Sequence, residues 1–148
     1  MSSTRKPIGI SGLAAYVPPY RVWLEDWCEW TGNHWPKTRE VVGRSFRLRG
    51  PDQSVYTLAA TAVMRLIEQY EIDPSRVKFL ALGTESSTDN SAGAIIVKGM
   101  VDRALVARGM PPLSRRCEVP EFKHACLGGV YGTKGAIRHL ALDGAGSQ

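Results

Sequence analysis

The sequence lacks the features that mark membrane-spanning, secreted and disordered proteins. No apolar run approaches the roughly 18 residues that a transmembrane helix needs. The polar N-terminus leads only into a short apolar segment, which differs from the apolar core of a signal peptide. Hydrophobic residues make up 43% of the 148 residues and charged residues 22%, which excludes disorder, collagen and coiled coil. We therefore expect one soluble domain located in the cytoplasm.

Clustered cysteines and clustered basic residues are also missing. The 3 cysteines, Cys28, Cys117 and Cys126, form no CxxC pair and no Cys/His group with zinc spacing. We therefore expect free thiols in a reducing compartment and no metal site. The net charge of +5 favours a phosphate-bearing partner, either nucleic acid or a nucleotide-tailed cofactor. Because the basic residues are scattered and not interleaved with aromatics, nucleic acid is the weaker of the two hypotheses.

Hydrophobic patterning predicts an alternation of strands and helices. Short apolar runs that end at turns predict strands over residues 8–17, 77–83 and 116–119. Apolar positions spaced by three and four predict helices over residues 54–70, 94–107 and 126–142. This β-α-β-α-β-α order is typical of an α/β domain with a mostly parallel sheet, because each helix connects neighbouring parallel strands.

Residues 21–50 give a mixed pattern that switches between short helix and loop. They contain all 4 tryptophans of the chain, Trp23, Trp27, Trp30 and Trp35. We interpret these side chains as packing or lid residues.

Cys126 is the candidate nucleophile. It is predicted at or just before a helix N-terminus, where unpaired N–H groups and the helix dipole favour a thiolate and stabilise an oxyanion. Gly128 and Gly129 follow, and their missing side chains would let an acyl group or a cofactor arm approach the backbone. The alternative is a buried cysteine that only fills space, which is the commoner state of a free cysteine.

Glu85 is the candidate acid/base. It follows the strand predicted over residues 77–83 and has small polar neighbours, and partial burial there would raise its pKa toward a working value. The alternatives are a solvated loop glutamate and a helix-capping carboxylate. His124 precedes Cys126 by two positions, and we interpret it as a structural or rim residue. Neighbours on one extended segment rarely give a base the lateral approach it needs.

Three motifs occur in a characteristic order along the chain. They are Tyr16-Val17-Pro18, Gly83-Thr84-Glu85-Ser86 with Asp89, and Ala125-Cys126 with Gly128-Gly129. Their order resembles the 3-hydroxy-3-methylglutaryl-CoA synthase family, including its relatives that build β-branches on polyketide carrier proteins. The resemblance implies a partial thiolase-like fold, with residues 1–148 as the N-terminal portion of a thiolase-like domain and the C-terminal half absent from this chain.

The same resemblance implies an acyltransferase that performs a Claisen-like condensation. Cys126 would take an acetyl group from a thioester, and Glu85 would remove a methyl proton so that the carbanion attacks an acetoacetyl thioester. Water would then release the product. Lys37, expected in a loop after the first helix, roughly aligns with a family lysine near the CoA phosphates. The substrates would be thioesters of CoA or of an acyl carrier protein, with no permanently bound cofactor.

The sequence also departs from the family pattern. Leu127 stands where an aromatic residue is usual, and the catalytic histidine of the family lies in a second half that this chain lacks. We therefore expect a subunit of a split or nicked enzyme, in a homo- or hetero-oligomer whose partner chain supplies that half. The alternatives are a ketoacyl-synthase-III-like condensing enzyme and a catalytically silent thiolase-fold partner or scaffold.

Overall fold

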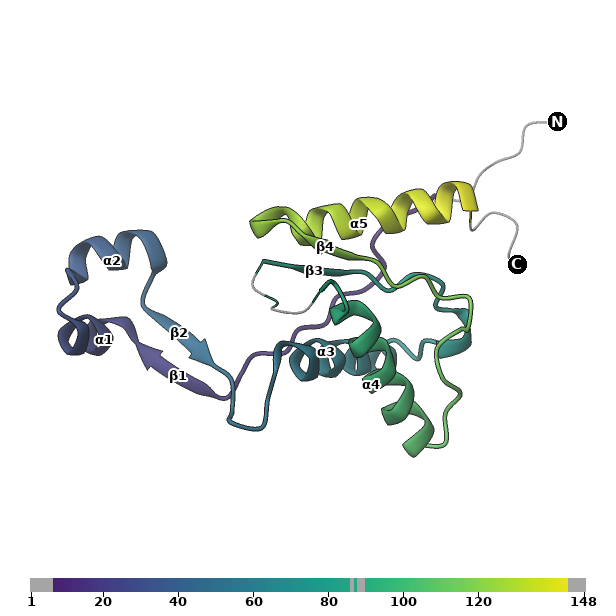
Figure 1. The fold of residues 1–148 in the computed structure, drawn as a ribbon, viewed down its shortest axis with the longest axis horizontal. Helices are drawn as coiled ribbons and strands as arrows, with labels where there is room; N and C mark the ends of the chain where they lie inside the picture. Colours follow the sequence, from purple (N-terminus) through teal and green to yellow (C-terminus); the bar gives the residue numbers. More distant parts are fainter. Residues whose placement is uncertain (1–6, 86, 88–89, 144–148) are drawn as a thin grey trace. The chain divides into compact units, whose positions relative to one another are not determined.

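The structure is a computed structural model that describes residues 7–85, 87 and 90–143. The chain divides into two compact units, of which unit 1 combines Met1–Ala15 with Val55–Gln148 and unit 2 is Tyr16–Ser54 (Figure 1). That residues 1–148 form one portion of a single thiolase-like domain stays a prediction.

Unit 2 consists of two short helices between two paired strands. Strand β1 (Tyr20–Trp23) pairs with β2 (Ser45–Leu48) in antiparallel orientation. Helix α1 (Leu24–Thr31) ends at Gly32 in the left-handed conformation, and α2 (Trp35–Val42) follows. The sequence predicted only helix and loop here, so these strands are a correction. Each is four residues long with most side chains exposed, which is too short and too polar for a hydrophobic period to show.

The tryptophans of unit 2 divide between packing and exposure. The Trp27 ring meets the Phe46 ring edge-on, with 6.5 Å between their centroids. This contact lies beside the buried side chains of Leu24 and Cys28 on the same helix. Trp30, in contrast, is 72% exposed.

Unit 1 carries the remaining helices and a parallel strand pair. Its elements are, in chain order, α3 (Val55–Gln69), the 3-10 turn η1 (Pro74–Arg76), β3 (Leu82–Thr84), α4 (Gly93–Ala107), β4 (Glu121–Lys123), the 3-10 turn η2 (Ala125–Leu127), α5 (Gly128–Arg138) and the π-helical turn η3 (His139–Asp143). The helices predicted over residues 54–70 and 94–107 are thereby confirmed. Among the described residues, no helix has both the length and the apolarity needed to cross a lipid bilayer.

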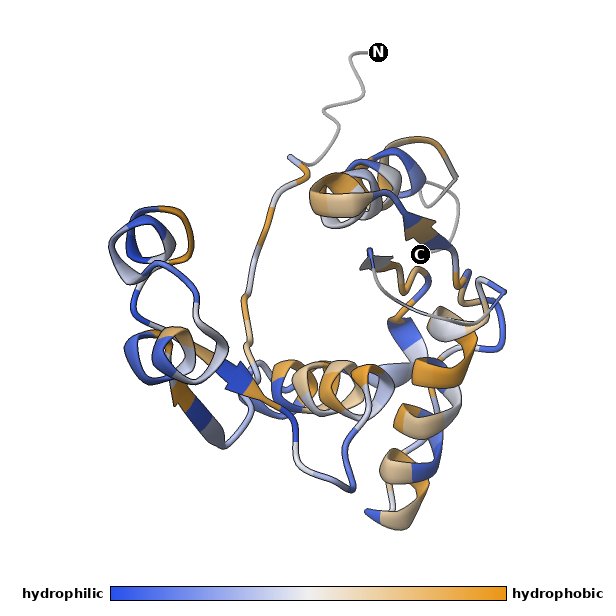
Figure 2. Ribbon diagram, turned by 60° about the vertical axis from the view of Figure 1, so that its left-hand side comes forward, coloured by the Kyte–Doolittle hydropathy of each residue, from blue (hydrophilic) through white to orange (hydrophobic). Residues whose placement is uncertain are grey.

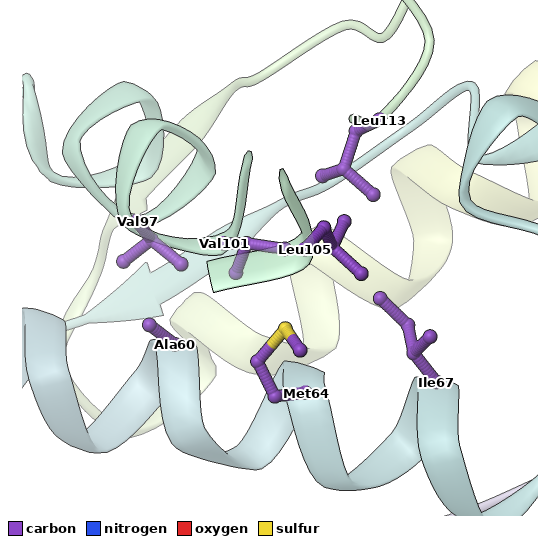
Figure 3. Packing of buried hydrophobic residues seen from close by; sticks show 7 residues of the cluster. All are labelled: Ala60, Met64, Ile67, Val97, Val101, Leu105 and Leu113. Carbon is purple, nitrogen blue, oxygen red and sulfur yellow. The ribbon is translucent and has the colours of Figure 1, made fainter. Parts of the chain in front are cut away.

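The core of unit 1 lies between α3 and α4. Their apolar faces, orange and tan in Figure 2, pack against each other because each helix repeats its apolar residues every three or four positions. The buried cluster in Figure 3 consists of Ala60, Met64, Ile67, Val97, Val101, Leu105 and Leu113. Val101 and Leu105 are 0% exposed, so they sit at its centre.

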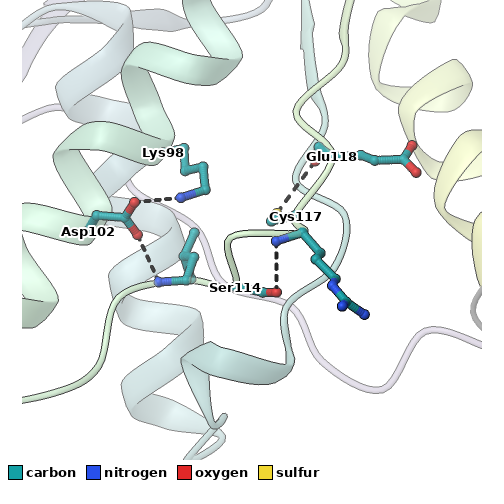
Figure 4. Close-up of polar contacts among 7 residues, drawn as sticks. Lys98, Asp102, Ser114, Cys117 and Glu118 are labelled. Atoms are coloured by element: carbon teal, nitrogen blue, oxygen red, sulfur yellow. Dashed lines mark hydrogen bonds and ion pairs between the residues drawn. The ribbon is translucent and has the colours of Figure 1, made fainter. Parts of the chain in front are cut away.

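A carboxylate on α4 fastens the loop that follows this helix. Asp102 pairs with Lys98 one turn earlier, with 2.6 Å between Nζ and Oδ2, and its other oxygen accepts the Leu113 N–H at 2.8 Å (Figure 4). This second bond holds the backbone of Leu113 next to α4, and the Leu113 side chain packs in the buried cluster, where it is 2% exposed.

The apolar run over residues 77–83 is covered on both faces, as its sequence predicted. Val77 and Leu80 pack against the α3/α4 cluster. On the other face, Ala81 and Phe79 lie against glycines of α5, and a Cβ added at Gly132 would come within 3.2 Å of Ala81. The parallel sheet is therefore enclosed between helices, as parallel sheets normally are.

A strand was predicted over residues 116–119, but the strand observed in this region, β4 (Glu121–Lys123), begins later in the chain. Only Glu118 of that segment pairs, in an isolated parallel bridge with Phe79, and β4 begins at Glu121. Pro120 separates the two parts, and its carbonyl accepts the Leu82 N–H at 3.1 Å. Proline has no N–H to give to the ladder, so the pairing is interrupted there and resumes after it.

The strand predicted over residues 8–17 is not formed among the described residues. The Leu13 N–H donates to the Tyr70 hydroxyl oxygen at 3.2 Å, and the Arg65 guanidinium donates to the Ala15 carbonyl at 2.8 Å. The segment is thus tied to α3 by side chains and has no strand beside it. Ile10 and Leu13 remain 82% and 79% exposed. The apolar run satisfies the sequence requirement for a strand, but a strand also needs a neighbour to pair with.

We expect Leu105→Ala to lower the free energy of unfolding by about 2–5 kcal/mol, because it leaves a cavity at the centre of the α3/α4 cluster. Ile95→Ala is the matched control, since Ile95 lies on the same helix but is 59% exposed, and it should change stability by no more than about 0.5 kcal/mol. Urea denaturation of both variants measures this. Equal losses would contradict the location of the core.

Candidate active site

The two candidate catalytic residues follow two paired parallel strands. In the β3/β4 register Leu82 is opposite Glu121 and Thr84 is opposite Lys123, so both strands end at the same edge. Glu85 comes directly after β3. At the end of β4, the His124 N–H donates to the Thr84 carbonyl at 3.3 Å, and η2 with Cys126 begins at the next residue. The pairing brings the two predicted residues to one edge of the sheet, where α/β proteins place their chemistry.

Glycines let the start of α5 rest directly on the end of β3. A Cβ added at Gly83 would lie 2.6 Å from the Gly129 Cα and closer still to its nitrogen. One added at Gly128 would lie 2.6 Å from the Phe122 carbonyl oxygen and 2.9 Å from the Thr84 nitrogen. The missing side chain of Gly128 is therefore required by packing, which corrects its interpretation as space for a ligand. Gly129 has no atom within 4 Å of an added Cβ.

The chain turns sharply between β4 and the helix that follows Cys126. Ala125 has a φ of +36°, which is uncommon for a residue with a side chain and costs of order 1–3 kcal/mol. The Leu127 N–H closes the 3-10 turn onto the His124 carbonyl at 2.8 Å. Strain of this kind persists where the surroundings fix the backbone, and here the glycine contacts between α5 and β3 do so.

The three cysteines differ in exposure. Cys28 and Cys117 are 2% and 9% exposed, and burial raises the pKa of the Cys117 thiol. These two fit the space-filling interpretation. Cys126 is an exposed free thiol at the start of a helical segment, so that alternative does not apply to it.

Glu85 is exposed. The partial burial expected from the sequence is not present in this chain, which is a correction. A carboxylate does cap helix α4, as one alternative for Glu85 supposed, but it is that of Glu121. Its Oε2 accepts the N–H of Gly93 at 2.7 Å and that of Ala94 at 3.3 Å. Glu121 is not among the functional residues predicted from the sequence, where its one signal is an acidic residue five positions before the cysteine.

The remaining candidates lie elsewhere. His124 is exposed and its ring meets that of Tyr131 edge-on, with 5.1 Å between centroids, which agrees with a rim residue. Lys37 is exposed on α2 of unit 2, and its expected place in a loop is wrong. Unit 2 also contains a hollow of about 380 Å³ that Lys37 does not line. Its lining residues are Trp23, Glu25, Asp26, Trp35, Arg39 and Arg44.

No protein-family model matches the chain. Among curated proteins, the hydroxymethylglutaryl-CoA synthase of Methanosphaera stadtmanae is 31% identical over 132 residues, which are 87% of this chain and 35% of that protein. The sequence resembles hydroxymethylglutaryl-CoA synthases. The enzyme of Enterococcus faecalis is 29% identical over 91% of this chain and 33% of its own. The chain thus spans about a third of the length of the curated relatives it matches.

Solved structures confirm a partial thiolase-like α/β fold. PksG, an HMG-CoA synthase from Bacillus subtilis, superposes with a TM-score of 0.74 over 95% of this chain and 32% of its own, at 16% identity. The β-ketoacyl-[acyl carrier protein] synthase III of Thermus thermophilus superposes with a TM-score of 0.66 over 92% of this chain and 39% of its own, at 19% identity. At these identities the likeness concerns the fold.

We expect Gly83→Ala to destabilise the protein by about 3 kcal/mol or more, because the new methyl group meets the α5 backbone, which cannot move aside as a side chain could. Gly129→Ala is the control at the opposite face of the same contact, where the added Cβ meets nothing within 4 Å. Thermal unfolding should show a large drop for the first variant and none for the second. Unchanged melting of Gly83→Ala would show that α5 does not rest on β3.

Proposed function

We propose that the chain is the nucleophile-bearing part of a hydroxymethylglutaryl-CoA-synthase-like condensing enzyme. The observation that carries this proposal is the shared edge of β3 and β4, which brings an exposed thiol, Cys126, next to the strand end that bears Glu85. Similarity to hydroxymethylglutaryl-CoA synthases over most of the chain supports the same class of reaction.

In the first step, the Cys126 thiolate attacks the carbonyl carbon of an acetyl thioester. The new bond is a thioester to Cys126, the broken bond is that to the carrier sulfur, and the carrier thiol leaves with the proton that Cys126 gave up. Thiolates are good acyl acceptors and good leaving groups, so the acetyl group can be both taken up and later released.

In the second step, the Glu85 carboxylate removes a proton from the methyl group of the acetyl-cysteine. The resulting carbanion forms a carbon–carbon bond with the ketone carbon of an acetoacetyl thioester, and the ketone oxygen takes up a proton to become a hydroxyl group. Water then cleaves the Cys126 thioester, which frees a carboxylate and restores the thiol. A carboxylate held at hydrogen-bonding distance from the proton suits this general-base role.

The remaining catalytic groups, the family histidine included, would come from the part of the curated relatives that this chain does not span. Several large apolar side chains of α5 and its continuation stay in contact with solvent, at 61% for Val130, 45% for Ile137 and 52% for Leu140. Patches of this kind mark association surfaces. We assign them to contact with the part that this chain lacks relative to its curated relatives. Lys37 stays a candidate contact for CoA phosphates, and a carrier protein is the alternative source of the thioester.

A ketoacyl-synthase-III-like reaction is the second candidate, because solved 3-oxoacyl-[acyl carrier protein] synthases III superpose on the chain with TM-scores of 0.65 to 0.68. The two candidates differ in their use of Glu85. A glutamate base is needed only in the hydroxymethylglutaryl-CoA-synthase-like reaction, so loss of condensation in Glu85→Ala favours the first candidate.

We expect the natively purified protein, with any chain that co-purifies, to take up one acetyl group from acetyl-CoA on Cys126. Intact-mass spectrometry measures the adduct, and Cys126→Ala should abolish it. Glu85→Ala should keep the adduct but lose condensation with acetoacetyl-CoA by at least about a hundredfold, since general-base catalysis contributes this much. Glu29→Ala, at an exposed position of α1, is the matched surface control.

Two results would contradict the proposal. An unacetylated protein would leave a catalytically silent partner or scaffold subunit as the better account. Acetylation with full condensation in Glu85→Ala would remove the general-base role and favour the ketoacyl-synthase-like reaction.

A further inference from the structure

Glu121 connects the strand that leads to Cys126 with the segment that follows Glu85. It is the first residue of β4, and its half-buried carboxylate reaches across to the start of α4. There Oε2 accepts the Gly93 and Ala94 N–H groups at 2.7 and 3.3 Å, while Oε1 accepts the Ser87 hydroxyl at 2.9 Å. Both oxygens thus bond described residues that follow Glu85 in the chain, namely Ser87 and the first two residues of α4.

The local sequence is adapted to this carboxylate. The N-cap residue of α4 is Ala92, whose methyl side chain cannot accept a hydrogen bond, so the side-chain cap comes from another element. A negative charge at this position is also favoured by the helix dipole. Gly93 provides the room, since a Cβ there would lie 2.9 Å from the carboxylate oxygen and 2.8 Å from a methyl group of Leu82.

We propose that Glu121 is a positioning residue that holds Glu85 in place for proton abstraction beside Cys126. Before Glu85, β3 is paired with β4. After it, Ser87 and the first residues of α4 bond Glu121, so described residues on both sides of Glu85 are anchored to the strand that leads to Cys126. Small displacements of a catalytic group reduce the rate strongly, by about a hundredfold per ångström. This inference rests on the proposed function.

The test compares Glu121→Gln and Ser87→Ala with wild type in the natively purified protein. Glu121→Gln removes the charge and keeps the shape, and Ser87→Ala removes only the hydroxyl contact. In both we expect normal acetylation of Cys126 by acetyl-CoA and condensation with acetoacetyl-CoA reduced by about tenfold or more. Acetylation should stay close to wild type even though the weaker cap in Glu121→Gln lowers the melting temperature modestly, whereas a merely structural role would lower the two activities together.

Amide hydrogen exchange gives a readout that does not depend on activity. The amides of Gly93 and Ala94 should exchange about tenfold faster in Glu121→Gln, because their charged acceptor is lost. Glu118→Gln is the control on the same segment of chain. Its side chain is 60% exposed and lies 3.4 Å from His139 rather than at α4, so exchange and condensation should match wild type.

Unchanged condensation in Glu121→Gln, with Glu85→Ala inactive, would overturn the positioning role and leave the proposed function standing. Full condensation in Glu85→Ala itself would overturn both, and the two failures are therefore distinguishable. Equal effects of Glu118→Gln and Glu121→Gln on condensation would also overturn the positioning role. The loss of condensation would then follow from removing either negative charge and would not depend on the contacts of Glu121.

Discussion

The parallel pairing of β3 with β4 is the interaction on which the candidate site depends. Both strands are three residues long, so their register alone decides which residues follow at the common edge. A shift by one residue would turn the side chains of one strand to the opposite face and would move Cys126 along the edge relative to Glu85. The glycine contacts between β3 and α5 reinforce this register. Only glycines allow the two backbones to approach so closely, so a shifted strand would bring a side chain into this contact.

Polar side chains fix the ends of α4, the helix that connects the two strands. Glu121 bonds its N-terminus and Asp102 bonds the loop beyond its C-terminus, so one carboxylate acts at each end. Between them the helix buries Val97, Val101 and Leu105 against α3. Helix α4 is therefore held at both of its ends and along its buried face.

Helices were predicted from the sequence more completely than strands. The helices at residues 54–70 and 94–107 show their buried faces in their own spacing, so no knowledge of distant residues is needed to find them. Strands depend on partners. Residues 8–17 have the composition of a strand but no neighbouring strand among the described residues, and β1 and β2 are paired without an apolar pattern of their own.

The candidate site was predictable to a similar degree. Cys126 and Glu85 were identified because each follows a strand, and the structure brings them to one edge. The exposure of Glu85, the packing role of Gly128 and the contacts of Glu121 were not predictable. The last two depend on residues distant in sequence: Gly128 on the backbone of Thr84, and Glu121 on the amides of Gly93 and Ala94.

Cross-linking between positions 85 and 126 tests the central claim most directly. In a Glu85→Cys variant with Cys28 and Cys117 intact but buried, a short reagent that joins two thiols should link position 85 to Cys126 within the folded chain, as peptide mapping would show. The same substitution at Arg138, at the other end of α5, should give no link. A link from position 138, with none from position 85, would contradict the shared edge.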